Sequence, residues 1–243
     1  MEPKKRTMSY YHYQPRVSLG GRPLTPGVKY LLLACVGVFL IQSVAPRTMF
    51  VFFGLIPVLV WKKYFFWQLG TYIFLHGGLF HLLFNLFALW MFGCELERQW
   101  GTRAFLKYFF VTGIGAGICY ALVRPGQLSP VIGASGAIYG ILLAYGMIFP
   151  NQMIYVWFLF PIRAKYFVIL FGLIELYSSI AGTGGGIAHV AHLGGMLFGY
   201  VYINYVRIFK GIYAVYLRYR LRRLRGHIRG VGGKKGDKDD YIN

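Results

Sequence analysis

The chain has 243 residues, of which 57% are hydrophobic and only 14% are charged, although its formal net charge is +19. A soluble domain carries about 25% charged residues, so this composition excludes a soluble enzyme, a disordered chain and a disulfide scaffold. The charges gather at the two ends, because residues 1–29 and 207–243 hold 21 of the 33 charged residues. An apolar body with basic ends is typical of a polytopic membrane protein.

Six apolar segments follow one another in this body, with Gly and Pro residues between them. A membrane-spanning helix needs about 20 mostly apolar residues, so there is room for six spans with short loops. The predicted helices are Tyr30–Ala45, Gly77–Phe92, Phe105–Val123, Val131–Phe149, Tyr166–Ala181 and Ile187–Val206. We therefore predict an all-α fold in which a six-helix membrane domain at 30–206 lies between basic tails at 1–29 and 207–243.

Two connections differ from the short loops. Residues Arg47–Gln68 are rich in Phe, Trp and Val, with Lys62 and Lys63 in the middle, which indicates a segment half submerged at the membrane surface. Residues Gln152–Ile162 are apolar and aromatic but too short to span alone. We expect them to form a short helix or a strand near the membrane face.

Lys and Arg divide unequally between the two sides of the predicted bundle. With the N-terminus inside, the inner segments carry 22 of these residues and the outer segments carry 4. Because cytoplasmic segments are enriched in basic residues, both termini are predicted to be cytoplasmic, in a bacterial-type inner (plasma) membrane. The basic tails are expected to meet anionic lipid headgroups, and no nucleic-acid partner is predicted.

Three predicted helices that run from outside to inside carry polar residues near their outer ends. His81 and Asn85 share a face of the second helix, since they are four residues apart. Ser135 lies near the start of the fourth helix and His192 near the start of the sixth. Each lies about 6–12 Å below the outer face at 1.5 Å per residue. Polar groups at membrane depth are commonly functional, so this shared depth predicts a site.

The residue types at this depth suit acyl transfer by a serine nucleophile. A base must take the Ser135 proton, and His192 is the natural candidate. Asn85, His81 and the backbone N–H of the serine are candidate donors to an oxyanion. Every Asp lies in the C-terminal tail and Glu175 lies in mid-helix. With no carboxylate at hand, we expect a Ser–His dyad rather than a triad.

Small residues favour close approach of the fourth and sixth helices. Gly136 and Gly140 are four residues apart, as are Gly195 and Gly199, and such small-xxx-small faces let helix backbones pack tightly. Tyr139, one turn below the serine, is expected to pack against the imidazole of the base and fix its orientation.

Three separated motifs resemble those of the rhomboid family of intramembrane serine proteases. Gly133-Ala134-Ser135-Gly136 resembles the family's Gly-x-Ser-Gly nucleophile turn. Ala191-His192-Leu193-Gly194-Gly195, with Gly199 after it, resembles the family's histidine–glycine helix. His81-Leu82-Leu83-Phe84-Asn85, preceded by His76-Gly77-Gly78, resembles its His-x-x-x-Asn oxyanion helix.

The resemblance covers about Trp67–Gly199 and implies cleavage of transmembrane substrates by a Ser–His dyad without a cofactor. It implies a nucleophile, a general base and two side-chain oxyanion donors, which are Ser135, His192, His81 and Asn85. One departure concerns the outer connection, where family members often carry Trp-Arg and this chain has Trp67-Gln68. That departure puts the anchoring of the connection in question.

Other readings of these residues stay open. The chain is alternatively a catalytically silent member of the same fold that binds membrane helices, or a small transporter, which Glu175 and the histidines suggest. His189 lies three residues before His192, yet a metal site needs three or more ligands and no third one has a fixed spacing, so no metal is predicted. Arg47–Gln68 and the Gly182–Gly186 turn, beside the outer end of the fifth helix, are the expected gates for substrate.

Overall fold

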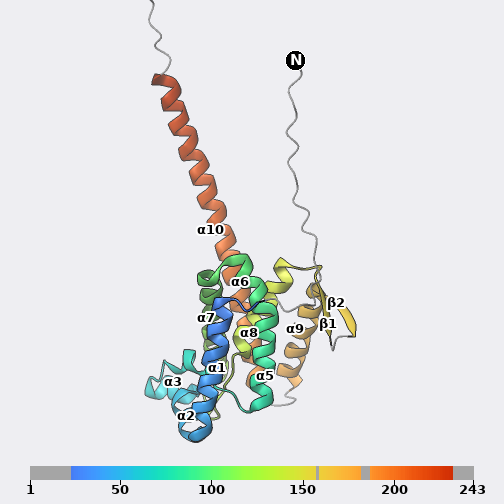
Figure 1. The fold of residues 1–243 in the computed structure, drawn as a ribbon. Helices are drawn as coiled ribbons and strands as arrows, with labels where there is room; N and C mark the ends of the chain where they lie inside the picture. Colours follow the sequence, from blue (N-terminus) through green and yellow to red (C-terminus); the bar gives the residue numbers. More distant parts are fainter. Residues whose placement is uncertain (1–22, 157–158, 182–186, 232–243) are drawn as a thin grey trace, which may run out of the picture.

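The computed structural model describes residues 23–156, 159–181 and 187–231. Most of these residues are helical, and one two-stranded sheet is present among them. Figure 1 shows the helices side by side in a bundle, from which the end of the last helix, α10, projects alone. The predicted helical membrane fold is confirmed, with the small sheet as an addition.

Helices occupy all six predicted segments. They are α1 (Pro26–Val44), α5 (Leu79–Ala88) continuing through the π-helical turn η2 (Leu89–Gly93) into α6 (Cys94–Trp100), α7 (Thr102–Val123), α8 (Ser135–Ile148), α9 (Ala164–Ala181) and α10 (Ile187–Val231). By length and composition, α1, α7, α9 and the continuous Leu79–Trp100 are long and apolar enough to cross a membrane, and α8 is a shorter apolar helix. The chain is an integral membrane protein, while the count of six spans and the side of the termini stay predictions.

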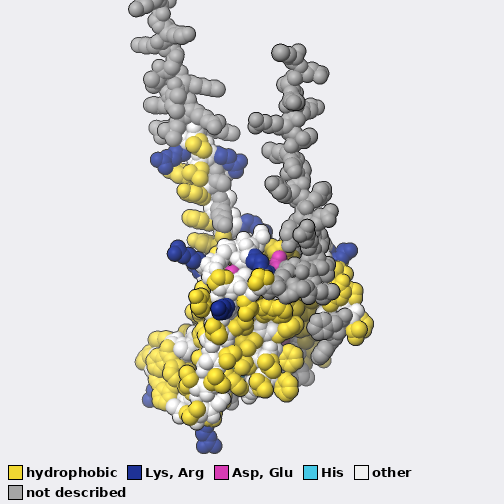
Figure 2. All heavy atoms as spheres, in the orientation of Figure 1, with side chains coloured by type: hydrophobic (Ala, Val, Ile, Leu, Met, Phe, Trp, Pro, Cys, Tyr) yellow, Lys and Arg dark blue, Asp and Glu magenta, His cyan; other side chains and the backbone are white. Residues whose placement is uncertain are grey.

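Hydrophobic side chains cover the visible surface of the bundle in Figure 2. Lys and Arg gather mainly where α10 leaves the bundle, with a few at the opposite end near α2 (Pro46–Phe53) and α3 (Pro57–Lys63). An apolar belt between two polar ends is the surface that a bilayer requires. The larger basic group lies at the end that the sequence assigns to the cytoplasm.

The N-terminus of α1 is capped by an acid from α6. Gly27 and Val28 donate their backbone N–H groups to the carboxylate of Glu97 over 2.7 and 2.9 Å, and the hydroxyl of Thr102 donates to it over 2.7 Å. The first N–H groups of a helix lack partners inside the helix, and a negative charge suits that end of the helix dipole. Glu97 therefore joins α1, α6 and α7, which explains why the second span continues well past its predicted end at Phe92.

The outer connection folds into α2, α3, α4 (Gln68–Thr71) and the short turn η1 (Tyr72–Phe74). The last carbonyl groups of α2 each accept a hydrogen bond of 2.8 Å from a later side chain, the donors being Gln68, Trp67 and Thr71 for Val51, Phe52 and Phe53. Gln68 is fully buried, and its side-chain oxygen also accepts from the N–H of Ile56 over 3.0 Å. The residue whose anchoring role was in question thus ties this connection together.

The segment Gln152–Ile162 forms most of a β-hairpin, which settles the choice between helix and strand. Strands β1 (Met153–Val156) and β2 (Phe160–Arg163) pair antiparallel, with Met153 opposite Arg163. Figure 1 shows the hairpin at the edge of the bundle beside α9. The hairpin leads directly into α9, since β2 ends at Arg163 and the helix begins at Ala164.

Two helix ends differ from the sequence prediction. Helix α8 begins at Ser135 rather than Val131, because Val131 exchanges two backbone hydrogen bonds of 2.9 Å with Leu55 of the outer connection. Helix α10 continues to Val231 rather than ending near Val206. No Pro interrupts that stretch, and its many Arg and Leu residues have high helix propensity.

Helices α7, α8 and α10 make the closest contacts of the bundle. A Cβ atom placed on Gly195 of α10 would collide with the backbone carbonyl of Gly136 on α8. At Gly199 an added Cβ would collide with the hydroxyl of Tyr108, which donates to the carbonyl of Gly140 over 2.7 Å. The two small-residue faces noted in the sequence meet here, and the backbones approach as closely as only glycine permits.

Candidate active site

The candidate site is formed where α8 and α10 contact each other. Ser135 is the first residue of α8 and His192 lies in the second turn of α10. Nε2 of His192 lies 2.7 Å from Oγ of Ser135, and both side chains are half-buried. A hydroxyl within hydrogen-bond reach of an imidazole nitrogen is the geometry of a serine activated by a base.

Gly133 shapes the turn that delivers the serine. Its φ of +120° is a conformation that only glycine adopts without strain, and its N–H donates to the carbonyl of Tyr72 over 2.9 Å. A Cβ atom at Gly133 would lie 2.8 Å from Nε2 of His81, which is too close. The imidazole of His81 therefore packs directly on the turn that precedes Ser135.

The proton position on His81 follows from its second nitrogen. Nδ1 of His81 accepts the backbone N–H of Gly77 over 3.2 Å. A neutral imidazole has one acceptor and one donor nitrogen, so Nε2 carries the hydrogen. His81 thus offers an N–H group next to the serine turn, as an oxyanion donor must.

Asn85 lies one turn after His81 on α5 and is buried. Its amide donates to the backbone carbonyl of His81 over 2.7 Å, and its side-chain oxygen has no partner among the described residues. One amide hydrogen remains for another acceptor. The structure brings Asn85 to the His81 side of the site, without a direct contact to Ser135.

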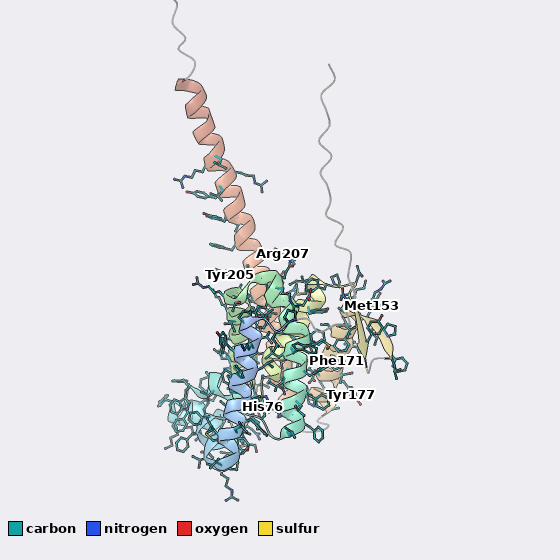
Figure 3. The ribbon with its side chains drawn as sticks, in the orientation of Figure 1. His76, Met153, Phe171, Tyr177, Tyr205 and Arg207 are labelled. Atoms are coloured by element: carbon teal, nitrogen blue, oxygen red, sulfur yellow. The ribbon has the colours of Figure 1, made fainter. Side chains whose placement is uncertain are left out.

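His76 is fully buried between the outer connection and α5, and Figure 3 shows it between α1 and α5. Its backbone N–H donates to the side-chain oxygen of Gln42 over 3.1 Å, and the Gln42 amide donates back to the His76 carbonyl. Its ring meets the His81 ring edge to face, with centroids 5.2 Å apart. Sequence reasoning missed Gln42, although a buried glutamine in an apolar helix is itself a signal.

On the far side of His192, Tyr139 and Glu175 complete the surroundings of the base. The rings of Tyr139 and His192 stack with centroids 4.3 Å apart and planes 12° apart. The hydroxyl of Tyr139 donates to Oε1 of Glu175, while Oε2 of the same carboxylate lies 2.5 Å from Nδ1 of His189 and 3.0 Å from Nδ1 of His192. The expectation that no carboxylate reaches the base is therefore wrong, because α9 carries a buried one into contact with it.

The carboxylate and the two imidazoles form a set of possible metal ligands. One ligand atom each from Glu175, His189 and His192 lie within 4.8 Å of one another. The sequence supplied no third ligand at a fixed spacing to the two histidines, and the fold supplies it in Glu175. Three protein ligands suit zinc, but a carboxylate placed between two imidazoles also forms hydrogen bonds and ion pairs with them without any ion.

Comparisons with known proteins match the part of the chain that contains this site. The family model described as Rhomboid domain matches residues 63–209, which is more than half of the chain. Similar curated proteins include "Rhomboid protease GluP" of Bacillus subtilis, 36% identical over 136 residues, and "Rhomboid protein 1, mitochondrial" of Saccharomyces cerevisiae, 31% identical over 145 residues. "RHOMBOID-like protein 6, mitochondrial" of Arabidopsis thaliana is 32% identical over 136 residues. Each match covers 55% of this chain, but only 25%, 40% and 41% of the respective relative.

Proposed function

This chain belongs to the rhomboid family, and we propose that it is an intramembrane serine endopeptidase that cleaves transmembrane segments of membrane proteins. The observation that carries the proposal is the 2.7 Å contact between Nε2 of His192 and Oγ of Ser135. Both residues belong to segments that match the family's motifs, and both come from helices that pack backbone against backbone. Ser135 is the nucleophile of this proposal and His192 is its general base.

In the first step the Ser135 Oγ attacks the scissile carbonyl carbon, while its proton passes to Nε2 of His192. The new C–O bond forms as the carbonyl electron pair moves to oxygen and creates an oxyanion. That pair then re-forms the carbonyl and the C–N bond breaks. The leaving nitrogen takes the proton from His192, which leaves an acyl group on Ser135.

Water completes the reaction at the same atoms. His192 takes a proton from water as the hydroxide oxygen bonds to the acyl carbon. The second tetrahedral intermediate collapses, the ester bond to Ser135 breaks, and the serine oxygen regains its proton from the histidine. The products are two shorter polypeptides, one with a new carboxyl end and one with a new amine.

Three N–H groups are the proposed oxyanion donors. The backbone N–H of Ser135 lies at the start of a helix, where it has no partner within the helix. Nε2–H of His81 lies against the Gly133 turn, and Asn85 retains one amide hydrogen. Each donor fixed in advance is worth on the order of 10²- to 10³-fold in kcat.

The substrate must present an unwound segment to Ser135. A transmembrane helix hides its carbonyl groups in its own hydrogen bonds, so cleavage near the outer face requires local opening of that helix. Of the two expected gates, Arg47–Gln68 is tied down by buried Gln68, and Gly182–Gly186 lies outside the described residues. We place substrate entry on the α9 side of the bundle.

The surroundings of the protein are part of the same proposal. Arg207, Arg218 and Arg220 are exposed on the projecting part of α10, where they can meet anionic lipid headgroups. The named relatives include a bacterial protein and two mitochondrial ones. A bacterial-type inner membrane stays our prediction for this chain, and cell fractionation would test it.

Reconstitution in liposomes with a model single-pass substrate tests the function. Wild-type protein is expected to cleave the substrate within or beside its membrane segment, and Ser135→Ala is expected to leave it intact. A silent helix-binding relative would retain the substrate without cleaving it. Ion or solute flux that survived Ser135→Ala would favour a transporter, although Glu175, which suggested one, is engaged with three side chains of the site.

A further inference from the structure

We propose that Glu175 is a positioning residue, whose carboxylate holds His192 in the tautomer and orientation that activate Ser135. Nucleophile, base and acid then form a Ser–His–Glu arrangement on three helices, α8, α10 and α9. The inference rests on the proposed protease function and adds to it the residue that controls the base.

The position of the proton on His192 supports this role. Nε2 must be the acceptor nitrogen if it is to take the Ser135 proton, so Nδ1 must carry the hydrogen. Nδ1 of His192 is buried and has no aligned hydrogen bond among the described residues. Oε2 of Glu175 lies 3.0 Å away, within hydrogen-bond distance of that nitrogen. Hydrogen bonds of this kind are often poorly aligned before substrate binds.

The charge that His192 acquires during the reaction also supports this role. When Nε2 takes the serine proton, the imidazole of His192 becomes a cation away from bulk water. A carboxylate beside Nδ1 stabilises that cation, whereas an apolar wall leaves it unpaired. Among the described residues, Glu175 is the only Asp or Glu that contacts the site.

Glu175 is itself held in place by neighbouring side chains. A lone acid in a membrane helix is costly, and this one is 6% exposed. The hydroxyl of Tyr139 donates to Oε1, and Nδ1 of His189 lies 2.5 Å from Oε2. Tyr139 also stacks on the His192 ring, so one side chain fixes both the base and the acid. The carboxylate is aimed by its neighbours rather than free to turn.

Full-length protein in liposomes allows this role to be measured in two ways. The first is the rate at which a fluorophosphonate labels Ser135, which needs no transmembrane substrate. The second is kcat and KM for the model substrate. The variants are Glu175→Gln, which keeps the shape but loses the charge, Glu175→Asp, which keeps the charge, and Leu173→Ala as an exposed control on the same helix.

Glu175→Gln is expected to lower both the labelling rate and kcat by about 10²- to 10⁴-fold with KM unchanged, since an amide beside the histidine supports the wrong tautomer. Glu175→Asp should recover a large part of the loss, and Leu173→Ala should match wild type. A labelling rate in Glu175→Gln that equals the wild-type rate would overturn the proposal. A loss that Glu175→Asp does not relieve, and that tracks a fall in melting temperature, would also overturn it by showing a purely structural role.

Two further measurements separate a positioning acid from a metal ligand. Under the proposal, EDTA leaves wild-type labelling unchanged, and His189→Gln labels faster than Glu175→Gln. Loss of labelling in EDTA with recovery on added Zn²⁺ would identify Glu175 as a metal ligand and overturn the proposal. If wild-type protein neither labels nor cleaves, the protease function itself fails, which differs from a failure confined to Glu175→Gln.

Discussion

Two parts of the bundle contribute to the site in different ways. In the most apolar stretch of α7 half of the residues are buried, compared with 22% in that of α9. Helix α7 also packs with α8 and α10 through glycines that leave no room for a Cβ atom. Helix α9 instead exposes most of its large side chains, and Figure 3 shows Phe171 and Tyr177 along it. The reacting pair thus comes from the tightly packed part. The acid comes from the least buried of the four long apolar helices.

This difference assigns separate tasks to the two parts. The backbones that carry Ser135 and His192 are held together by the glycine contacts between α8 and α10, which side-chain motion does not alter. The Glu175 contact depends on how α9 sits, because only its inward face meets the bundle. Variants that disturb the glycine contacts of the central helices should therefore affect both stability and activity, whereas variants of α9 should affect activity when they reach Glu175 and little otherwise.

The largest effect is expected at the reacting pair itself. Ser135→Ala and His192→Ala should each lower kcat on the order of 10⁶-fold, the size of loss when a serine nucleophile or its base is removed. Ser135→Ala should leave the melting temperature unchanged, because it removes one oxygen atom from a half-buried side chain, whereas His192→Ala also removes the ring that stacks on Tyr139 and should lower it modestly. Substrate cleavage and thermal unfolding in the same liposomes check both statements. Residual activity near the wild-type level would remove these residues from the mechanism.

A matched pair of glycine variants tests the packing comparison. Gly195→Ala brings a new methyl group onto the backbone carbonyl of Gly136. Gly172→Ala, on α9, brings its methyl group only against the flexible end of Met196, 3.3 Å away. Overpacking typically costs about 1–3 kcal/mol, and a collision with backbone belongs at the upper end. We expect Gly195→Ala to lower the melting temperature and labelling rate, and Gly172→Ala to leave both near wild type. Equal behaviour of the two variants would end the distinction.

A variant of the outer connection is expected to have an effect of intermediate size. Gln68→Ala leaves the N–H of Ile56 and the carbonyl of Val51 without their partner, and buried polar groups left unpaired cost about 1–3 kcal/mol each. A lower melting temperature is expected. Trp67→Phe removes a hydrogen bond at a more exposed side chain and serves as the control with a smaller change. A larger loss in Trp67→Phe than in Gln68→Ala would contradict the anchoring role.

The smallest effect is expected at the link between the two parts. Tyr139→Phe keeps the ring that stacks on His192 and removes only the hydroxyl that donates to Glu175. A hydrogen bond to a charged group contributes about 1.5–3 kcal/mol, and part of that loss is recovered when the carboxylate keeps its other contacts. The labelling rate should fall about tenfold, with less effect than Glu175→Gln. A fall as large as that of Glu175→Gln would show that Tyr139 has a further role.

Hydropathy predicted where the helices lie, because apolar length decides which segments cross a membrane. It failed at ends that distant contacts determine. The start of α8 depends on the bridge between Leu55 and Val131. Helix α6 extends past the predicted end of the second span, and there Glu97 accepts hydrogen bonds from the start of α1. Neither partner can be read from local sequence.

Shared depth in the membrane predicted that the serine, the histidine and His81 lie in one region, and depth is also the signal for Glu175. Helix α9 runs from inside to outside in the predicted topology, so Glu175 lies six residues from its outer end at Ala181. At 1.5 Å per residue that is about 9 Å, the depth of the reacting pair. Its position in mid-helix made the acid look remote. Which face of α9 turns inward, however, depends on packing that the sequence does not contain.

The most direct test of the account is the site at which a fluorophosphonate reacts with the full-length protein, determined by intact mass and peptide mapping. The account predicts one adduct, on Ser135, that disappears in Ser135→Ala and in His192→Ala although both variants stay folded. An adduct on another residue, or undiminished labelling of Ser135 in His192→Ala, would contradict it.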